Sequence, residues 1–244
     1  MTTINLEGSG SVQQNDSMTG RIKTYMNLSP HHLLAASRSV GRVRQIEKEY
    51  EFQPLGPFWE EILHNALGIA TLTVASLECY ANELYFENTI FPPTLNPIAT
   101  TMAAPMVEKE TVLFKFEFAL ALNSGKRLSH GEPSVQNVAA LIKLRNSVLH
   151  FRPEWFDEQD KHDKLSRLLI HKFELSRFLP GEPVFPRAWA SGSFAVWALE
   201  STVSFLDYFY AEAAILSPLD KLRKRLSEYA GTDILTSHAA TDTL

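Results

Sequence analysis

The chain has 244 residues, of which 45% are hydrophobic and 21% are charged, and its formal net charge at pH 7 is −5. This is the profile of an ordinary soluble protein with enough apolar residues for one sizeable core. Because the chain carries no overall basic excess, we do not expect extensive nonspecific binding to nucleic acid, and an RNA site would have to rely on local charge.

The chain ends and its apolar runs bear on domain organisation and location. Residues 1–20 are polar and contain no apolar segment, which predicts a flexible arm and no signal peptide. The longest apolar run, Ala66 to Leu77, is shorter than the roughly 20 residues that span a bilayer. We therefore expect a cytoplasmic protein that does not enter a membrane, with one helical domain at 21–230 and a flexible tail at 231–244. The single cysteine, Cys79, gives no intramolecular disulfide.

Helical periodicity dominates the rest of the chain, and prolines, glycines and capping residues indicate where the helices begin and end. The predicted helices, in chain order, cover residues 29–50, 56–84, 106–122, 133–151, 158–178, 191–216 and 217–229. Pro- or Gly-rich connections are expected at 91–97, 125–133 and 180–186. Thr3–Leu6 could pair weakly with residues 22–26, but no alternating segment is long enough for a sheet. The expected fold class is all-α, an antiparallel helical bundle.

The helix at 56–84 is apolar around most of its circumference, so we expect it to be central, with neighbours on several sides. Ser29 is expected to cap the first helix, with Pro30 at its first position. His162, in the helix expected at 158–178, is predicted to lie on an exposed face.

Three polar residues interrupt the apolar side of the helix at 133–151. Arg145 follows Leu141 on one seam, and Asn146 and His150 lie one turn apart on the neighbouring seam. A charged group that is partly withdrawn from water is costly unless it is paired or bound to a ligand. Pro153 ends this helix soon after His150. The cluster is therefore a candidate for either an internal ion pair or a ligand site.

Arg145, four intervening residues and His150, with Asn146 directly after the arginine, resemble the signature of the HEPN superfamily, which is Arg, four to six residues, His. The stretch 75–83, in which Glu78 and Asn82 interrupt an apolar run, resembles the earlier long helix of such proteins. The resemblance implies a HEPN-like bundle of four core helices with flanking helices.

The resemblance also implies a function. Many HEPN proteins are metal-independent endoribonucleases whose site forms across a homodimer, some of them toxins or defence components, and others have lost catalysis. It implies that His150 acts as general base on a ribose hydroxyl while Arg145 stabilises the charge on the phosphate, with Asn146 in the site. Members with a modified tyrosine two residues after the histidine differ, because this chain has Arg152 there.

Further roles and partners follow from the same reading. Glu78 and Asn82 are expected to support the site, and Lys143 and Arg152 to contact RNA. The expected partners are RNA, a second copy of the chain, and an antitoxin or regulatory protein, without cofactor or metal. One geometric difficulty is that positions five apart on a helix point about 140° from each other.

Less specific interpretations remain open. Arg145 could form a structural salt bridge with Glu78, and the bundle could serve RNA or nucleotide binding or protein interaction without catalysis. A third alternative is a scaffold whose partner surface is the last long helix, rich in aromatic residues such as Trp197, Phe205 and Tyr208. An open cleft lined by Arg145 and His150 would favour the enzyme, and a sealed pair with Glu78 would favour the scaffold.

Overall fold

The structure, a computed structural model, describes residues 26–87, 90–92, 95, 101–102, 104–154 and 160–234. All regular elements in these ranges are helical, which confirms the prediction of an all-α chain. The predicted arm at 1–20, nearly all of the suggested strand pair, most of the connection at 91–97 and most of the tail lie outside the described residues.

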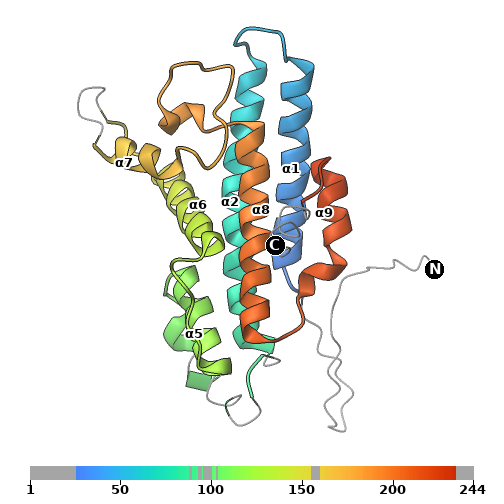
Figure 1. Cartoon of the computed structure of the whole chain (residues 1–244), viewed down its shortest axis with the longest axis vertical. Coiled ribbons are helices and arrows are strands. Elements are labelled where there is room, and N and C mark those ends of the chain that lie inside the picture. Colours follow the sequence, from blue (N-terminus) through green and yellow to red (C-terminus); the bar gives the residue numbers. More distant parts are fainter. Residues whose placement is uncertain are drawn as a thin grey trace, which may run out of the picture.

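The first two helices form an antiparallel pair (Figure 1). Helix α1 (Ser29–Glu49) begins with a proline in its first turn, and α2 (Phe58–Glu87) carries two glutamates in its first turn. Both features suit a helix N-terminus. Helix α2 contacts α1, α5, α6 and α8, so its apolar circumference is explained by neighbours on several sides, as its sequence pattern predicts.

By length and composition, α2 is also able to cross a membrane. The stretch Phe58–Phe86 is long and apolar enough, and 44% of its most apolar part is buried inside the chain. The core helix of a soluble protein meets the same criterion, and the packing of α1, α5, α6 and α8 against α2 is the packing of a core helix.

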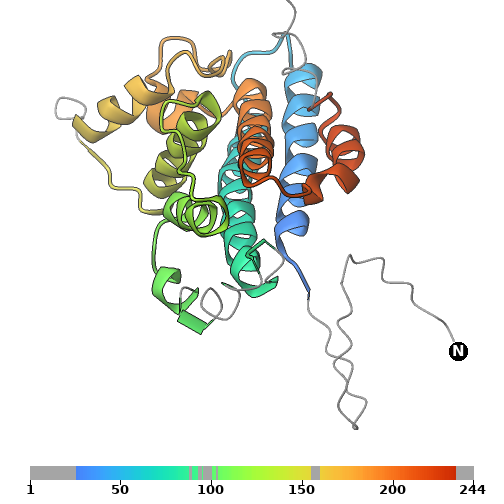
Figure 2. The same cartoon turned by 60° about the horizontal axis from the view of Figure 1, so that its bottom comes forward.

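The remaining elements follow α2 in chain order: α4 (Ala104–Val107), α5 (Val112–Ser124), α6 (Pro133–Leu149), α7 (Asp160–Leu169), a π-helical turn η2 (Val184–Ala188), α8 (Gly192–Ala213), a 3-10 turn η3 (Pro218–Lys221) and α9 (Arg223–Ala230). Helices α1, α2 and α8 run side by side along the length of the molecule (Figures 1 and 2). Helices α5 and α6 lie against α2 and α8, and α9 covers α1 on the opposite side.

Two predicted helices end or begin elsewhere. The helix expected at 106–122 is divided, because the Thr111 hydroxyl accepts a hydrogen bond from the Phe114 amide and starts α5 inside the predicted range. The helix expected at 158–178 ends at Leu169, since His171 adopts a φ of 70° in the left-handed region. No glycine or proline marks that end in the sequence, so the pattern did not reveal it.

The start of α1 is capped from outside the helix. The expected role of Ser29 as N-cap is wrong, because its hydroxyl donates to Glu83 Oε2 at 2.5 Å and its amide donates to Glu83 Oε1 at 3.2 Å. Glu83 lies on α2, and Ser76 of the same helix donates to the Ser29 carbonyl at 2.8 Å. The carboxylate of α2 thereby satisfies donors that a helix N-terminus leaves free.

Aromatic side chains join α5 to α8 in the core. Phe116 lies edge-to-face against Phe205 and Phe209, with ring centroids 5.0 and 4.8 Å apart. All three are fully buried, and Trp197 is 9% exposed. The aromatic residues of α8 are therefore used inside the chain, which weakens the idea that they form a partner surface.

Candidate functional site

The three motif residues, Arg145, Asn146 and His150, lie at or just after the C-terminal end of α6. The helix stops at Leu149, and His150 follows it with φ −111° and ψ 39°, outside helical geometry. Its amide donates to the Asn146 carbonyl at 2.9 Å. Because His150 has left the helix, its direction is not fixed by the 100° step per residue that made the motif spacing look unfavourable.

Arg145 reaches across to α2. Its Nη2 donates a hydrogen bond to Glu78 Oε1, so the structural salt bridge considered from the sequence is present. The Arg145 side chain is 17% exposed and the Glu78 side chain 46%, so the pair lies at the edge of the α2–α6 contact and is not sealed. A guanidinium has five N–H donors, and this bond uses one of them. The buried Nε has no partner in the described part of the chain.

Asn146 and His150 differ from Arg145 in having no internal side-chain partner. Both side chains are exposed. Within the described ranges, neither the side-chain carboxamide of Asn146 nor the imidazole of His150 forms a hydrogen bond or an ion pair. His150 is flanked by two exposed apolar residues, Leu149 and Phe151. The structure thus brings Arg145 to Glu78 but joins neither of them to His150 by a hydrogen bond.

The segment after His150 is held against α7. His162 Nε2 lies 3.1 Å from the Arg152 carbonyl, and the His162 ring stacks on Phe151 with centroids 5.5 Å apart. Glu154 accepts hydrogen bonds from the backbone amides of Lys161 and His162. The expectation that His162 is exposed is wrong: it is 7% exposed, because it packs beneath this segment. These contacts fix the chain on the C-terminal side of the motif.

Asn82 does not support Arg145 directly. Its Oδ1 accepts a hydrogen bond from Lys115 Nζ of α5 at 2.9 Å. Lys115 is 6% exposed, and sequence reasoning missed it. The available signal was its position between Phe114 and Phe116 in the otherwise apolar part of α5, where a lysine is out of place.

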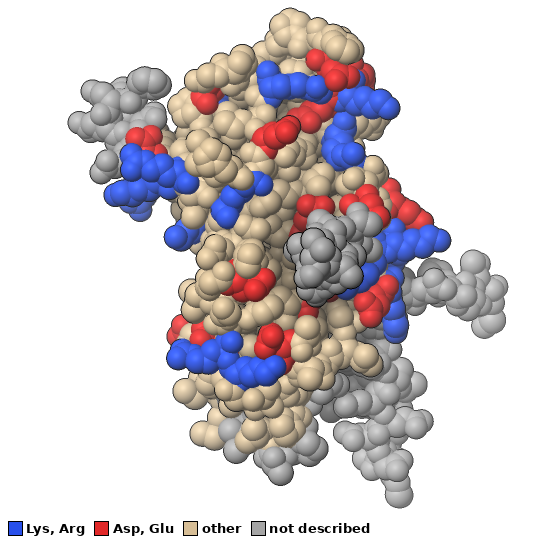
Figure 3. Space-filling view, viewed as in Figure 1, with Lys and Arg blue, Asp and Glu red and all other residues tan. Residues whose placement is uncertain are grey.

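Of the candidate basic residues, Lys143 and Arg152 are exposed, and their charged groups have no ion pair in the part of the chain that the structure describes. Some other basic groups are paired with carboxylates, including Arg127 with Glu117 at 2.9 Å. Most of the face displayed in Figure 3 carries neither charge, and several of its Lys and Arg side chains lie beside Asp or Glu. Exposed basic side chains without an ion pair in the described ranges therefore include Lys143 and Arg152 and, on the neighbouring α7, Lys161, Lys164 and Arg167.

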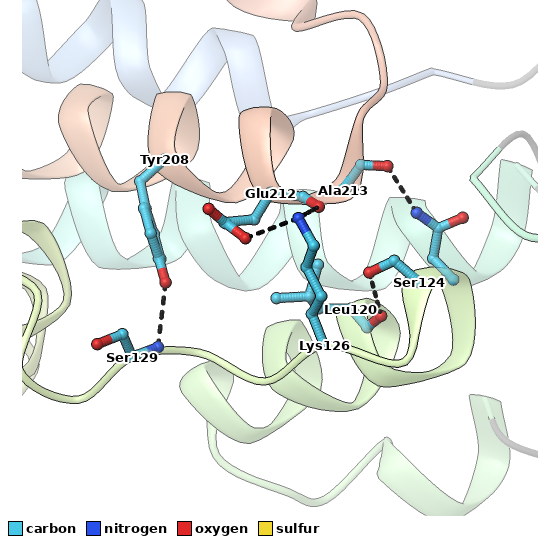
Figure 4. Close-up of polar contacts among 8 residues, drawn as sticks. Leu120, Ser124, Lys126, Ser129, Tyr208, Glu212 and Ala213 are labelled. Atoms are coloured by element: carbon cyan, nitrogen blue, oxygen red, sulfur yellow. Dashed lines mark hydrogen bonds and ion pairs between the residues drawn. The ribbon is translucent and has the colours of Figure 1, made fainter.

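The connection between α5 and α6 is tied to α8 (Figure 4). Lys126 pairs with Glu212 at 3.0 Å, so this lysine is also neutralised. The Tyr208 hydroxyl accepts a hydrogen bond from the Ser129 amide at 3.0 Å. These bonds hold the start of α6, and hence the helix that carries the motif, against α8.

A pocket of about 590 Å³ lies elsewhere, between the C-terminal end of α1 and the N-terminal end of α8, and none of the motif residues lines it. Its charged lining includes Glu47, whose pKa is raised by burial even though its Oε1 accepts a hydrogen bond from the Gly192 amide at 2.8 Å. Arg177 donates to the Glu47 carbonyl and pairs with Glu51. Arg44 of the same lining donates to the backbone carbonyls of Ala230 and Gly231, and Lys172 donates to Asn137 Oδ1 at 2.8 Å.

Among the described residues, no group of three or more His, Cys, Asp or Glu side chains is arranged to hold a metal ion. The thiol of Cys79 has its pKa raised by burial, which disfavours a reactive thiolate. No protein-family model, curated protein or solved structure matches this chain. The resemblance to HEPN proteins therefore rests on the motif residues and their helical setting.

Proposed function

We propose that the protein is a HEPN-like endoribonuclease, with α1, α2, α6 and α8 as its core helices and the end of α6 as its site. The supporting observation is the contrast within α6: Glu78 fixes Arg145, while Asn146 and His150 are exposed without internal side-chain partners. A fixed guanidinium and, five positions later in the chain, an imidazole without an internal partner are chemical groups suited to a phosphodiester ligand.

In this proposal the neutral imidazole of His150 takes the proton of a ribose 2′-hydroxyl. The 2′-oxygen forms a bond to the adjacent phosphorus, and the bond to the 5′-oxygen breaks as that oxygen takes a proton from water. The products are a 2′,3′-cyclic phosphate and a 5′-hydroxyl end. Arg145 donates hydrogen bonds to the non-bridging oxygens, whose negative charge grows in the transition state. Glu78 holds the guanidinium in place through its own hydrogen bond.

A second copy of the chain is the proposed partner at this site. Leu149 is 51% exposed and Phe151 is 48% exposed, so apolar surface flanks His150 on both sides. Packing these side chains against a second copy would remove them from water and place two motifs near each other. An antitoxin or regulatory protein that covers the same surface would inhibit the enzyme.

The test is cleavage of a pool of single-stranded and structured RNA in the presence of a chelator. We expect cyclic phosphate ends from the wild type, and about 10²- to 10⁴-fold slower cleavage by His150→Ala, the range for loss of a general base. Arg145→Ala should also be slow. His64→Ala is the matched control, because His64 is an exposed histidine on α2. Purified in parallel, it should keep wild-type activity and so exclude a contaminating nuclease.

No cleavage by well-folded wild type, or full activity in His150→Ala, would overturn the proposal. The second candidate is then a non-catalytic HEPN-like bundle that binds RNA, nucleotides or a protein, favoured by the fact that the Arg145–Glu78 bond ties α6 to α2. Under that alternative, Arg145→Met lowers stability while His150→Ala changes neither stability nor any RNA chemistry.

A further inference from the structure

Lys115 is the only Lys, Arg, Asp or Glu that is buried among the described residues. Its ammonium has three N–H donors, and in the described part of the chain it makes one hydrogen bond, to the neutral Asn82 Oδ1 at 2.9 Å. No carboxylate of the described ranges pairs with it. A buried charge without a counter-charge is costly, so this ammonium is suited to a negatively charged ligand.

The position of Lys115 links it to the motif. Asn82 lies four residues after Glu78 on α2, so the two side chains share one face of the helix, separated by about 6 Å along its axis. Arg145 reaches Glu78 from α6, and Lys115 reaches Asn82 from α5. Figure 1 shows α5 and α6 on the same side of α2. Two cations from different helices therefore meet neighbouring positions of one helix face.

The charges along this face are unequal. Glu78 offsets the charge of Arg145, whereas Asn82 leaves that of Lys115 uncompensated. Asn82 itself is exposed, so a ligand can reach the Asn82 side of this contact. The Nδ2 group of Asn82, which has no partner in the described ranges, is available as a further donor.

We propose that Lys115 and Asn82 form a phosphate subsite for the nucleotide next to the scissile one, with Lys115 contacting a phosphate that is not cleaved. This proposal rests on the proposed function, because it assigns the ligand as RNA. Lys115 is then a binding residue that sets the register of the strand relative to Arg145 and His150. Successive phosphates of one strand would lie along α2, one at each cation.

The test measures binding of a fully 2′-O-methylated RNA oligonucleotide, which has no hydroxyl for the cleavage step, over a series of salt concentrations. Loss of one phosphate contact lowers the slope of log affinity against log salt by about 0.7 for a single strand. We expect Lys115→Met to show that loss of slope and roughly tenfold weaker binding at low salt. Lys224→Met is the control, since Lys224 is exposed on α9 and pairs weakly with Glu228 at 3.9 Å. It should keep the wild-type slope.

Asn82→Asp provides a second, independent variant on the exposed side of the contact. It supplies Lys115 with a carboxylate, so we expect a higher melting temperature together with weaker RNA binding and a reduced salt slope. A lysine that is only structural predicts the higher melting temperature with binding unchanged. This variant also keeps the test decisive if Lys115→Met does not fold.

The outcomes separate this proposal from the nuclease. If the wild type cleaves RNA and both variants keep its affinity and slope, the subsite is wrong and the nuclease stands. If the wild type binds methylated RNA in a Lys115-dependent way but cleaves no RNA, the subsite stands and the nuclease is wrong. If the wild type does not bind the oligonucleotide, the subsite is overturned.

Discussion

Arg145 of α6 donates a hydrogen bond to Glu78 of α2, a residue 67 positions earlier in the chain. The pair is partly open to solvent, with side-chain exposures of 17% and 46%, so water screens the attraction between its charges less than it does in a fully exposed ion pair. A double-mutant cycle of Arg145→Met and Glu78→Gln should give a coupling of about 1 kcal/mol in urea unfolding.

The matched cycle uses Arg42→Met and Glu61→Gln, because that pair joins α1 to α2 and is exposed on both sides, at 41% and 47%. We expect its coupling to be about 0.5 kcal/mol or less. Equal couplings at the two sites would contradict a special role for the partly buried Arg145 contact.

Glu83 is predicted to stabilise the start of α1. Glu83→Ala removes the acceptor of the Ser29 amide and hydroxyl, and Ser29 is fully buried, so its donors lose their partner away from water. The free energy of unfolding should fall by about 1–3 kcal/mol. Glu49→Ala, at the exposed C-terminal end of the same helix, should change it by less than about 0.5 kcal/mol. A similar effect of both substitutions would show that the Glu83 cap contributes little.

Two helix glycines should respond in opposite directions to alanine. A Cβ at Gly41 would collide with the carbonyl oxygen of Tyr229, so Gly41→Ala must displace α9 from α1 and should cost about 1–3 kcal/mol. At Gly68 nothing lies within 4 Å of the added Cβ, so Gly68→Ala should stabilise α2 by about 0.5–1 kcal/mol. Thermal melting of both variants measures this, and an unchanged melting temperature for Gly41→Ala would show that α9 is not held closely on α1.

Glu47 makes stability depend on pH. Burial raises its pKa, so the folded state binds this proton more tightly than the unfolded state does. The stability that this bound proton contributes is fully present below the ordinary glutamate pKa of about 4.3. It is lost as the pH rises through the higher pKa of the folded state. In Glu47→Gln, the fall in unfolding free energy between pH 4 and pH 7 should be smaller than in the wild type.

Urea unfolding at several pH values checks this, with Glu108→Gln as the control, because Glu108 is exposed in the turn after α4. The control should keep the wild-type pH profile. A Glu47→Gln profile that matches the wild type would mean that burial of this carboxylate does not contribute to the pH dependence.

The sequence indicated helix positions well where local chemistry marks them. Pro30 and Pro133 lie in the first turns of α1 and α6, and Gly231 ends α9 with a φ of 63°. These residues act on their own backbone, so their effect is readable without neighbours. The end of α7 before His171 has no such mark, and the pattern placed it too late.

Some features of the candidate site were likewise readable from local sequence, and others were not. The spacing of Arg145, Asn146 and His150 is local, and so is the conflict of a cation with an apolar seam, which led to Glu78 as a partner. The position of Lys115 in an apolar stretch of α5 is also local, but its partner is not: Asn82 lies 33 positions earlier, on another helix.

By itself, the sequence determined that the chain is helical, that α2 is apolar around most of its circumference and that three polar residues lie near the end of α6, because periodicity and capping are properties of neighbouring residues. Only the tertiary structure decided that Glu83 caps α1, that α8 buries Phe205 and Phe209 and that Lys115 meets Asn82. Those contacts depend on how helices pack against one another, and packing brings together residues whose separation along the chain carries no signal.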